Sequence, residues 1–272
     1  MKYLLLILAA GVCLFPVYWM ALGSVQESAV IMSLPPQVFP HFGTWENYEL
    51  ILEDARLVLW VSNTVSLVSL AVVCGVLTTM MAAYAMARYE FVGKALVFHL
   101  LVAGLVIPGA MLFVPRFVIV ERLGLWGSRL GVLLAYPFNP MHIVIARNYI
   151  KGIPEALAES ARIDGAGEWL ILIRIILPLC RPILGAIAVW NAITAMSDFL
   201  WQYLVLMDPE KHTLLVGLIN ATMRDINKYL YYTNPIGMRL AAGTILFVPL
   251  ILMFAFFQRY FRGGLTVGAL KA

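Results

Sequence analysis

The sequence predicts an all-α integral membrane protein with six transmembrane helices. Hydrophobic residues make up 62% of the 272 positions and charged residues only 12%, whereas soluble domains are nearer to half apolar and a quarter charged. The mean hydropathy is +0.88. A soluble domain of this length could not bury so much apolar surface, so lipid must cover it. Six apolar stretches, nearly free of charged residues, give the number of spans.

A helix that crosses the hydrocarbon core needs about 20 apolar residues. The first stretch follows Lys2, as a signal peptide would, but it is longer than a usual signal core and further spans follow, so we expect an anchor. The second is long enough to tilt. Prolines interrupt the third at Pro108 and the fourth at Pro137, and the fifth contains one charge, Asp198. The expected spans are residues 3–26, 57–87, 95–118, 130–148, 182–207 and 240–260.

The distribution of charge predicts the orientation. With the N-terminus inside, the inner segments carry eleven basic and five acidic residues, a balance of +6, and the outer segments carry eight basic and nine acidic residues, a balance of −1. Basic residues favour the cytoplasmic side of a membrane. We therefore expect both termini in the cytoplasm, with most of the bias coming from the segment between the fourth and fifth spans.

Several chemical functions are disfavoured by the sequence. It contains no Walker-type phosphate-binding motif and no metalloprotease or serine-hydrolase motif, so nucleotide binding, metal binding and hydrolysis are not expected of this chain. Cys13, Cys74 and Cys180 lie in or next to apolar stretches without metal-ligand spacing, which favours buried apolar roles. The basic residues form short clusters between apolar stretches, which is not the pattern of a nucleic-acid-binding surface.

The inner segment 151–178 predicts a short helix–turn–helix. Pro154 suits the first turn of a helix, and Glu155 and Glu159 lie near its positive end. Gly165 is typical of the left-handed residue that ends a helix. A second helix is expected from about Glu168 to Leu177, with Pro178 ending it. By spacing alone, an ordinary solvated amphipathic connector accounts for the pattern as well as a docking element does.

The same segment resembles the cytoplasmic loop motif E-A-A-x3-G-x9-I-x-L-P of ABC importer permeases. Six of seven positions match, and Ser160 replaces the first alanine by another small residue. The matching positions are Glu159, Ala161, Gly165, Ile175, Leu177 and Pro178. The resemblance implies a type I ABC importer permease fold, in which this loop forms a coupling helix that docks on a partner ATPase. The implied coupling residues are Glu155, Glu159, Ser160, Ala161, Asp164, Gly165 and Ala166.

Further segments are similar to the smaller membrane subunit of maltose-type carbohydrate importers: Thr44-Trp-Glu-Asn-Tyr48, Arg88-Tyr-Glu-Phe-Val-Gly-Lys94, and Gly264-Leu-Thr-Val-Gly-Ala-Leu-Lys271 within the expected cytoplasmic tail 261–272. The resemblance implies a plasma-membrane subunit in a bacterium or archaeon that pairs with a second permease. It also implies two ATPase subunits or domains, which bind ATP and magnesium, and an extracytoplasmic solute-binding protein that delivers a carbohydrate. This chain itself is expected to bind no cofactor, metal or nucleic acid.

Polar residues in the fifth span are candidates for the solute path. Asn191, Thr194, Asp198 and Gln202 follow helical spacing, and Trp201 lies beside them. Hydroxyl-binding and aromatic side chains together suit a carbohydrate. Polar stripes also hold helices together, and tryptophan often marks the membrane interface.

Two other classes of function remain open. An ion-coupled secondary transporter would use Asp198 as its coupling carboxylate, although such folds often show internal repeats that are not found here. A membrane enzyme is disfavoured, because no catalytic constellation can be assembled. Within the importer class, a solute other than a carbohydrate is a further alternative.

Overall fold

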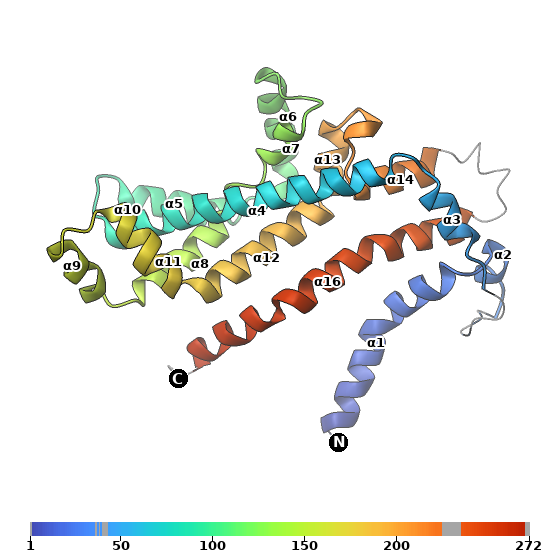
Figure 1. Cartoon of the computed structure of the whole chain (residues 1–272), viewed down its shortest axis with the longest axis horizontal. Helices are drawn as coiled ribbons and strands as arrows, with labels where there is room; N and C mark the ends of the chain where they lie inside the picture. Colours follow the sequence, from blue (N-terminus) through green and yellow to red (C-terminus); the bar gives the residue numbers. More distant parts are fainter. Residues whose placement is uncertain (1, 36, 38, 40–42, 225–234, 270–272) are drawn as a thin grey trace. The chain divides into compact units, whose positions relative to one another are not determined.

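The computed structural model describes residues 2–35, 37, 39, 43–224 and 235–269 (Figure 1). Within these residues all regular secondary structure is helical, as predicted. The chain forms two compact units: Met1–Asn63 with Asp208–Leu252, and Thr64–Met207 with Met253–Ala272. Two long helices, α4 (Leu57–Arg88) and α16 (Pro235–Ala269), contribute residues to both units.

Three helices in the described part of the chain are long and apolar enough to cross a membrane alone, namely α1 (Lys2–Gly23), α4 and α16. Two bent pairs bring the number to as many as five. The first pair, bent by 108°, is Lys94–Gly104 with Gly109–Arg122, and the second, bent by 85°, is Glu168–Leu179 with Arg181–Ser197. The expected count of six spans therefore stays a prediction.

The first unit also contains α2 (Ser28–Ile31), α3 (Glu46–Leu52), the 3-10 helix η3 (Pro209–Lys211) and α14 (Leu214–Arg224). Its core surrounds Trp60, which is 2% exposed and donates from its indole nitrogen to the carbonyl of Pro209 at 2.8 Å. Gly217 allows α14 to approach this ring, because an added Cβ would lie 2.2 Å from it. The first unit is thus packed around one indole.

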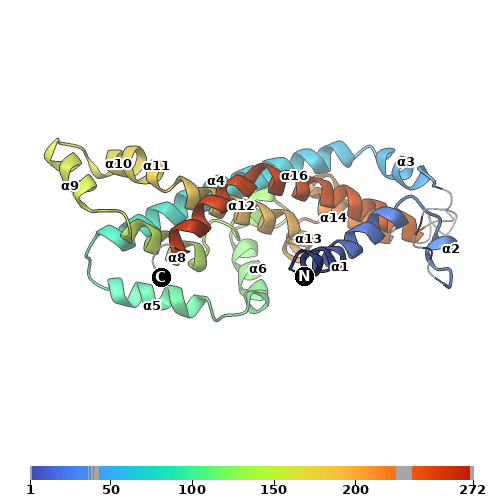
Figure 2. The ribbon, with the colours of Figure 1, turned by 90° about the horizontal axis from the view of Figure 1, so that it is seen from below.

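The second unit holds the remaining helices: α5 (Lys94–Gly104), η1 (Gly109–Leu112), α6 (Phe113–Arg122), α7 (Arg129–Leu133), α8 (Pro140–Lys151), α9 (Ala156–Ile163), α10 (Glu168–Ile171), the π-helix η2 (Leu172–Ile176), α11 (Leu177–Leu179), α12 (Arg181–Ser197) and α13 (Phe199–Val205). In both views α9 lies at one end of this unit (Figures 1 and 2). One core, with Ile150, Ile171 and Ile176, lies against α4 beside the α9–α10 segment. A second core surrounds Trp201 and Tyr136.

Several expected helix limits differ from those of the structure. The expected single helix over 182–207 is wrong, because α12 ends at Ser197 and α13 begins at Phe199. The carboxylate of Asp198 accepts a hydrogen bond from the backbone N–H of Trp201 at 3.3 Å, so Asp198 caps α13 instead of lying within one long helix. Stretches 95–118 and 130–148 are also broken, at Gly104 and after Leu133.

Two further boundaries differ. Pro178 does not end the second helix of the inner segment: it lies within α11, and the chain bends at Cys180. The π-helix η2 precedes this proline, and the N–H of Leu177 bonds the carbonyl of Leu172, five residues back. This wider turn leaves room for the ring of Pro178, which in a regular α-helix would clash with the carbonyl of the residue four positions earlier. The helix α16 continues to Ala269, past the expected limit of 260 and through most of the expected tail, and residues 270–272 lie outside the described part.

Candidate coupling site

The predicted helix–turn–helix is present in the inner segment. The helix α9 ends in a Schellman motif around Gly165, whose φ is +81°. The N–H of Gly165 donates to the carbonyl of Arg162 at 3.0 Å, and that of Ala166 to the carbonyl of Ala161 at 2.9 Å. These two bonds satisfy carbonyls that the helix end would leave open. Ala161 and Ala166 lie at the two positions that the motif brings together. The turn itself therefore explains why small residues flank this glycine.

One face of this segment is buried and the other is exposed. Ala158 and Ile171 are fully buried against α4, and Ala161 and Ala166 pack at the edge of the same core. The opposite side presents Leu157, which is 44% exposed, and Ile163, which is 86% exposed, to the surroundings. The remaining predicted coupling residues are also exposed: Glu155, Glu159, Ser160, Asp164 and Gly165. Exposed apolar residues among carboxylates are typical of a protein-docking surface.

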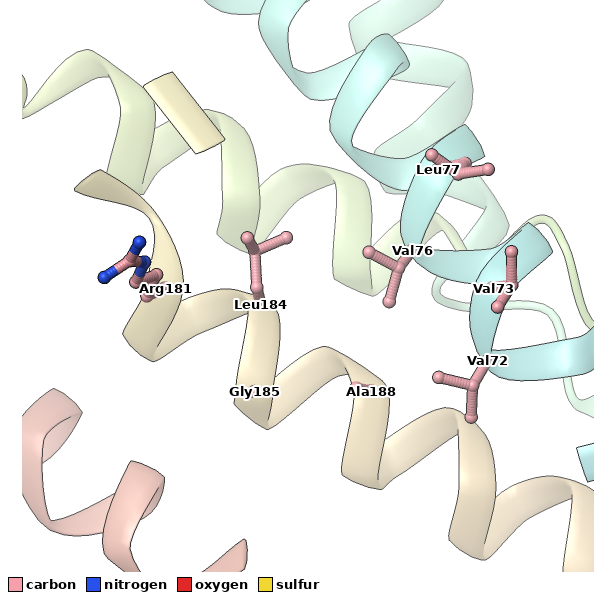
Figure 3. A pocket seen from close by; sticks show the side chains of 8 residues that line it. All are labelled: Val72, Val73, Val76, Leu77, Arg181, Leu184, Gly185 and Ala188. Atoms are coloured by element: carbon pink, nitrogen blue, oxygen red, sulfur yellow. The ribbon is translucent and has the colours of Figure 1, made fainter. Parts of the chain in front are cut away.

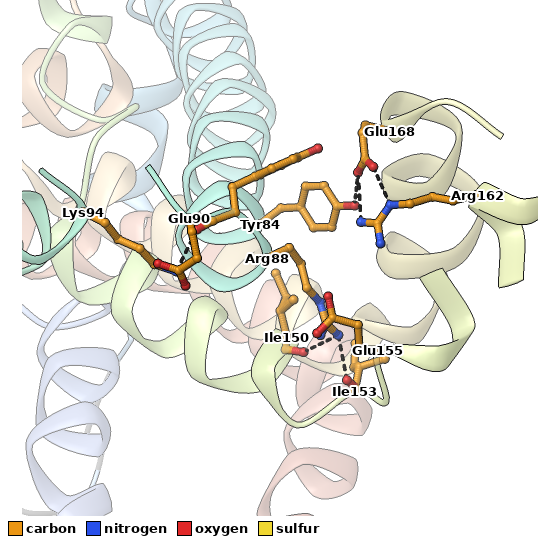
Figure 4. A network of polar contacts seen from close by, with 10 residues as sticks. Tyr84, Arg88, Glu90, Lys94, Ile150, Ile153, Glu155, Arg162 and Glu168 are labelled. Carbon is orange, nitrogen blue, oxygen red and sulfur yellow. Dashed lines mark hydrogen bonds and ion pairs between the residues drawn. The ribbon is translucent and has the colours of Figure 1, made fainter. Parts of the chain in front are cut away.

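A buried arginine, Arg88, joins the end of α4 to this segment (Figure 4). Its side chain is 5% exposed, and its guanidinium donates to the carbonyl oxygens of Ile150 at 3.1 Å and Ile153 at 2.6 Å. The carboxylate of Glu155 lies 3.6 Å from the same guanidinium. The positive charge therefore lies at the carbonyl end of α8, where the helix dipole favours it. This role of Arg88 is not evident from the sequence, because its acceptors lie 62 and 65 residues further along the chain.

A carboxylate, Glu168, forms the second junction. The hydroxyl of Tyr84 donates to it at 2.7 Å, and the guanidinium of Arg162 donates to its other oxygen at 2.7 Å. These hydrogen bonds, that of Arg162 first, and a further one from Tyr89 lower the pKa of Glu168 to about 2. Burial and the hydrogen bond to Glu168 raise the pKa of Tyr89 to about 12. The cluster links α4, α9 and α10 through one ionised group.

The candidate solute residues do not form one continuous stripe. Asn191 is buried against α4, where an added Cβ on Gly75 would lie 2.5 Å from its amide nitrogen. Gln202 is fully buried and donates to the carbonyl of Ala195 at 2.6 Å. In the same region Trp201 lies in a core and Asp198 caps α13. Thr194 is exposed, so of the five candidates only Thr194 projects from the surface of this chain.

A pocket of about 570 Å³ lies between α4 and α12 (Figure 3). Its lining is apolar except for the guanidinium of Arg181 at one end: Val72, Val73, Val76, Leu77, Leu184, Gly185 and Ala188. A carbohydrate site needs several convergent polar groups. The pocket does not provide such a site within this chain.

Long apolar helices and a helix–turn–helix with one buried and one exposed face indicate a membrane permease. Residues 62–267 match the family described as the binding-protein-dependent transport system inner membrane component, and the chain belongs to this family. The resemblance found in the loop motif is confirmed. The protein is therefore a membrane-spanning transport subunit of an ABC importer and not an enzyme.

Relatives match along nearly the whole chain. The arabinooligosaccharides transport system permease protein AraQ of Bacillus subtilis is 30% identical over 261 residues, which cover 95% of this chain and 90% of the relative. The trehalose/maltose transport system permease protein MalG of Thermococcus litoralis is 34% identical over 272 residues, with 97% and 94% covered. A crystal structure of a bacterial ABC transporter that imports alginate has a chain with a TM-score of 0.82, 24% identity and coverage of 96% and 95%. This likeness supports the type I ABC importer permease fold.

Proposed function

We propose that this chain forms half of the translocation pathway of an ATP-driven importer for a carbohydrate that an extracytoplasmic solute-binding protein delivers. The observation that carries the proposal is the helix–turn–helix with one face anchored to α4 and the other exposed. The carbohydrate class follows from the relatives, whose names specify arabinooligosaccharides, diacetylchitobiose and trehalose or maltose. Solutes of another class are the alternative.

The exposed face of α9 is the proposed contact with an ATPase subunit. Leu157 and Ile163 supply the apolar centre of this contact, and Glu159 and Asp164 supply charge at its rim. Burial of two large aliphatic side chains in an interface contributes about 1.5–3 kcal/mol each. In the proposed assembly two ATPase subunits or domains bind ATP and magnesium, and a second permease completes the pathway. The expected six spans with both termini in the cytoplasm would put the loop on the ATPase side, and the charge balance favours this orientation.

The test uses the complex purified with its partner subunits and reconstituted in liposomes. Glu159→Lys and Gly165→Pro should each abolish the stimulation of ATP hydrolysis by the loaded solute-binding protein. The first variant reverses a rim charge, and the second places proline where φ is +81°. A matched control is Glu90→Gln, which removes an exposed charge at the preceding inner loop and should have no effect. Full stimulation in both loop variants would refute the proposal.

Uptake experiments separate this function from ion-coupled transport. Depletion of ATP should stop uptake, and an uncoupler added at constant ATP should leave uptake unchanged. Asp198 caps α13 and accepts a 3.2 Å hydrogen bond from the hydroxyl of Tyr136. These contacts favour a structural role for this carboxylate over ion coupling. Uptake that follows the ion gradient and not ATP would reverse this conclusion.

A further inference from the structure

The contacts between α4 and the inner segment are of two kinds and extend from Met80 to Arg88, about two turns of α4. Apolar contacts bring Ala158 and Ile171 into the core that contains Met80 and Ala83. Polar contacts come from Tyr84 to Glu168 and from Arg88 to the carbonyl end of α8. Figure 4 shows the two polar junctions on successive turns of the same helix. Each junction therefore attaches a different part of the inner segment to α4.

The Arg88 junction holds the entry to the segment. A buried guanidinium is costly unless its charge is compensated, and here two backbone carbonyls and the carboxylate of Glu155 provide the compensation. Ile150 belongs to the last turn of α8, Ile153 to the connection, and Glu155 directly precedes α9. Movement of α9 away from α4 would carry Glu155 away from a guanidinium whose side chain is only 5% exposed. The entry to α9 is thus fixed to α4.

The Glu168 junction holds the exit from the turn. Glu168 is the first residue of α10, and its carboxylate accepts one hydrogen bond from Tyr84 of α4 and another from Arg162 in the last turn of α9. Charge-assisted bonds of this kind are about twice as strong as neutral ones. Because three helices meet at one carboxylate, a shift of α9 alone would break at least one of these bonds. The turn is fixed to α4 on its other side as well.

From these contacts we infer that Arg88 and Glu168 are positioning residues, which make α9, α10 and the inner end of α4 move as one body. The inference rests on the proposed function. A displacement that the ATPase imposes on α9 is then delivered to α4 directly, and it is not absorbed by bending of the loop.

Distances between spin labels test this inference in the complex assembled with its ATPase partners. One label is placed at Ala156 in α9 and the other at the exposed Met81 in α4, after replacement of the three native cysteines Cys13, Cys74 and Cys180. The α4–α9 distance should be the same without nucleotide and with ATP and vanadate. In Arg88→Ala and Glu168→Gln it should shift or broaden only in the nucleotide-bound state. If Arg88→Ala does not assemble, Glu155→Gln tests the same junction, because it removes the carboxylate 3.6 Å from the guanidinium. Tyr84→Phe is the milder variant of the Glu168 junction, since it removes one hydroxyl and keeps the ring.

Several results would overturn the inference. A distance that changes with nucleotide in the unsubstituted loop would show that α9 and α4 move separately. Equal broadening with and without nucleotide in the variants would show a purely stabilising role. Glu90→Gln, whose ion pair with Lys94 lies at the neighbouring inner loop, should leave the distance unchanged. ATP hydrolysis by the same samples separates the two proposals. If the parent complex does not hydrolyse ATP, the proposed function is refuted. If it hydrolyses ATP while the α4–α9 distance changes with nucleotide, only this inference is refuted.

Discussion

Gly165 permits a sharp test of the turn, because a second glycine two residues later serves as its control. Gly165 has a φ of +81°, whereas Gly167 has a φ of −73° and a ψ of 159°. A Cβ added at either position would meet no atom within 4 Å. Alanine therefore creates no steric contact at either site, and the two substitutions differ only in the backbone conformation that alanine must adopt.

The expected magnitudes follow from this difference. A left-handed conformation costs an L-residue other than glycine about 1–2 kcal/mol. Replacing glycine by alanine also restricts the unfolded chain, which stabilises by about 0.4–1 kcal/mol where the conformation is compatible. Gly165→Ala should therefore destabilise the turn by about 1 kcal/mol, and Gly167→Ala should stabilise it slightly. The two variants should differ by about 1–2 kcal/mol, or about 5–30-fold in the equilibrium for opening the turn.

Hydrogen exchange of the purified complex measures this equilibrium. The amides of Gly165 and Ala166, which close the Schellman motif, should exchange faster in Gly165→Ala and no faster in Gly167→Ala. Gly165→Asn should lie between the two, because asparagine tolerates the left-handed region better than alanine. Equal exchange in the two alanine variants would refute the assignment of the turn, and so would faster exchange in Gly167→Ala.

Three further predictions concern packing and charge. Gly75→Ala should lower the unfolding temperature in detergent, at a cost of about 1–3 kcal/mol, because the new methyl group would lie 2.5 Å from the amide of Asn191. Asn191→Ala in the same chain should restore most of the lost stability. If it restores none, the predicted contact is wrong. Gln202→Leu should lower the free energy of unfolding by about 1–3 kcal/mol, because the carbonyl of Ala195 loses its 2.6 Å hydrogen bond. An unchanged unfolding temperature together with an altered solute preference would indicate a role in the solute path instead. The pKa of Glu168 is lowered from 4.5 to about 2, so its ionised form stabilises the loop fully above about pH 4.5 and loses this effect as the pH falls towards 2. The difference in exchange protection between the parent and Glu168→Gln should be constant above pH 5 and shrink below it, and a difference that grows in acid would contradict this assignment.

The inner segment was predictable because its determinants are local. Gly165 and its flanking alanines form a motif whose hydrogen bonds span at most five residues, so the turn can be identified from neighbours along the chain. The helix–turn–helix and its resemblance to a known loop therefore follow from the sequence. Family membership and the all-helical fold agree with that interpretation.

The helix break at Asp198 was not predictable from hydropathy. Residues on both sides are apolar, and an aspartate in such a stretch indicates a polar interior as readily as a cap. The helix breaks there because the N–H of Trp201 donates to the carboxylate of Asp198, and because Trp201 is buried in a core that distant segments build. Arg88 was missed for a related reason, because its acceptors are backbone carbonyls 62 and 65 residues further along the chain.

The π-helix at Leu172–Ile176 fixes the length of the chain between the turn and the bend at Cys180. A π-turn contains one residue more than an α-turn, so it takes up that residue while the segments on either side keep their direction. Deletion of a single residue there would give a regular α-turn and would leave the exposed side of α9 facing nearly the same way. The ring of Pro178 would then meet the carbonyl of the residue four positions earlier, a clash that costs about 3 kcal/mol in a regular helix. The loss of one residue in this stretch should therefore lower the stability of the bend without redirecting the docking face.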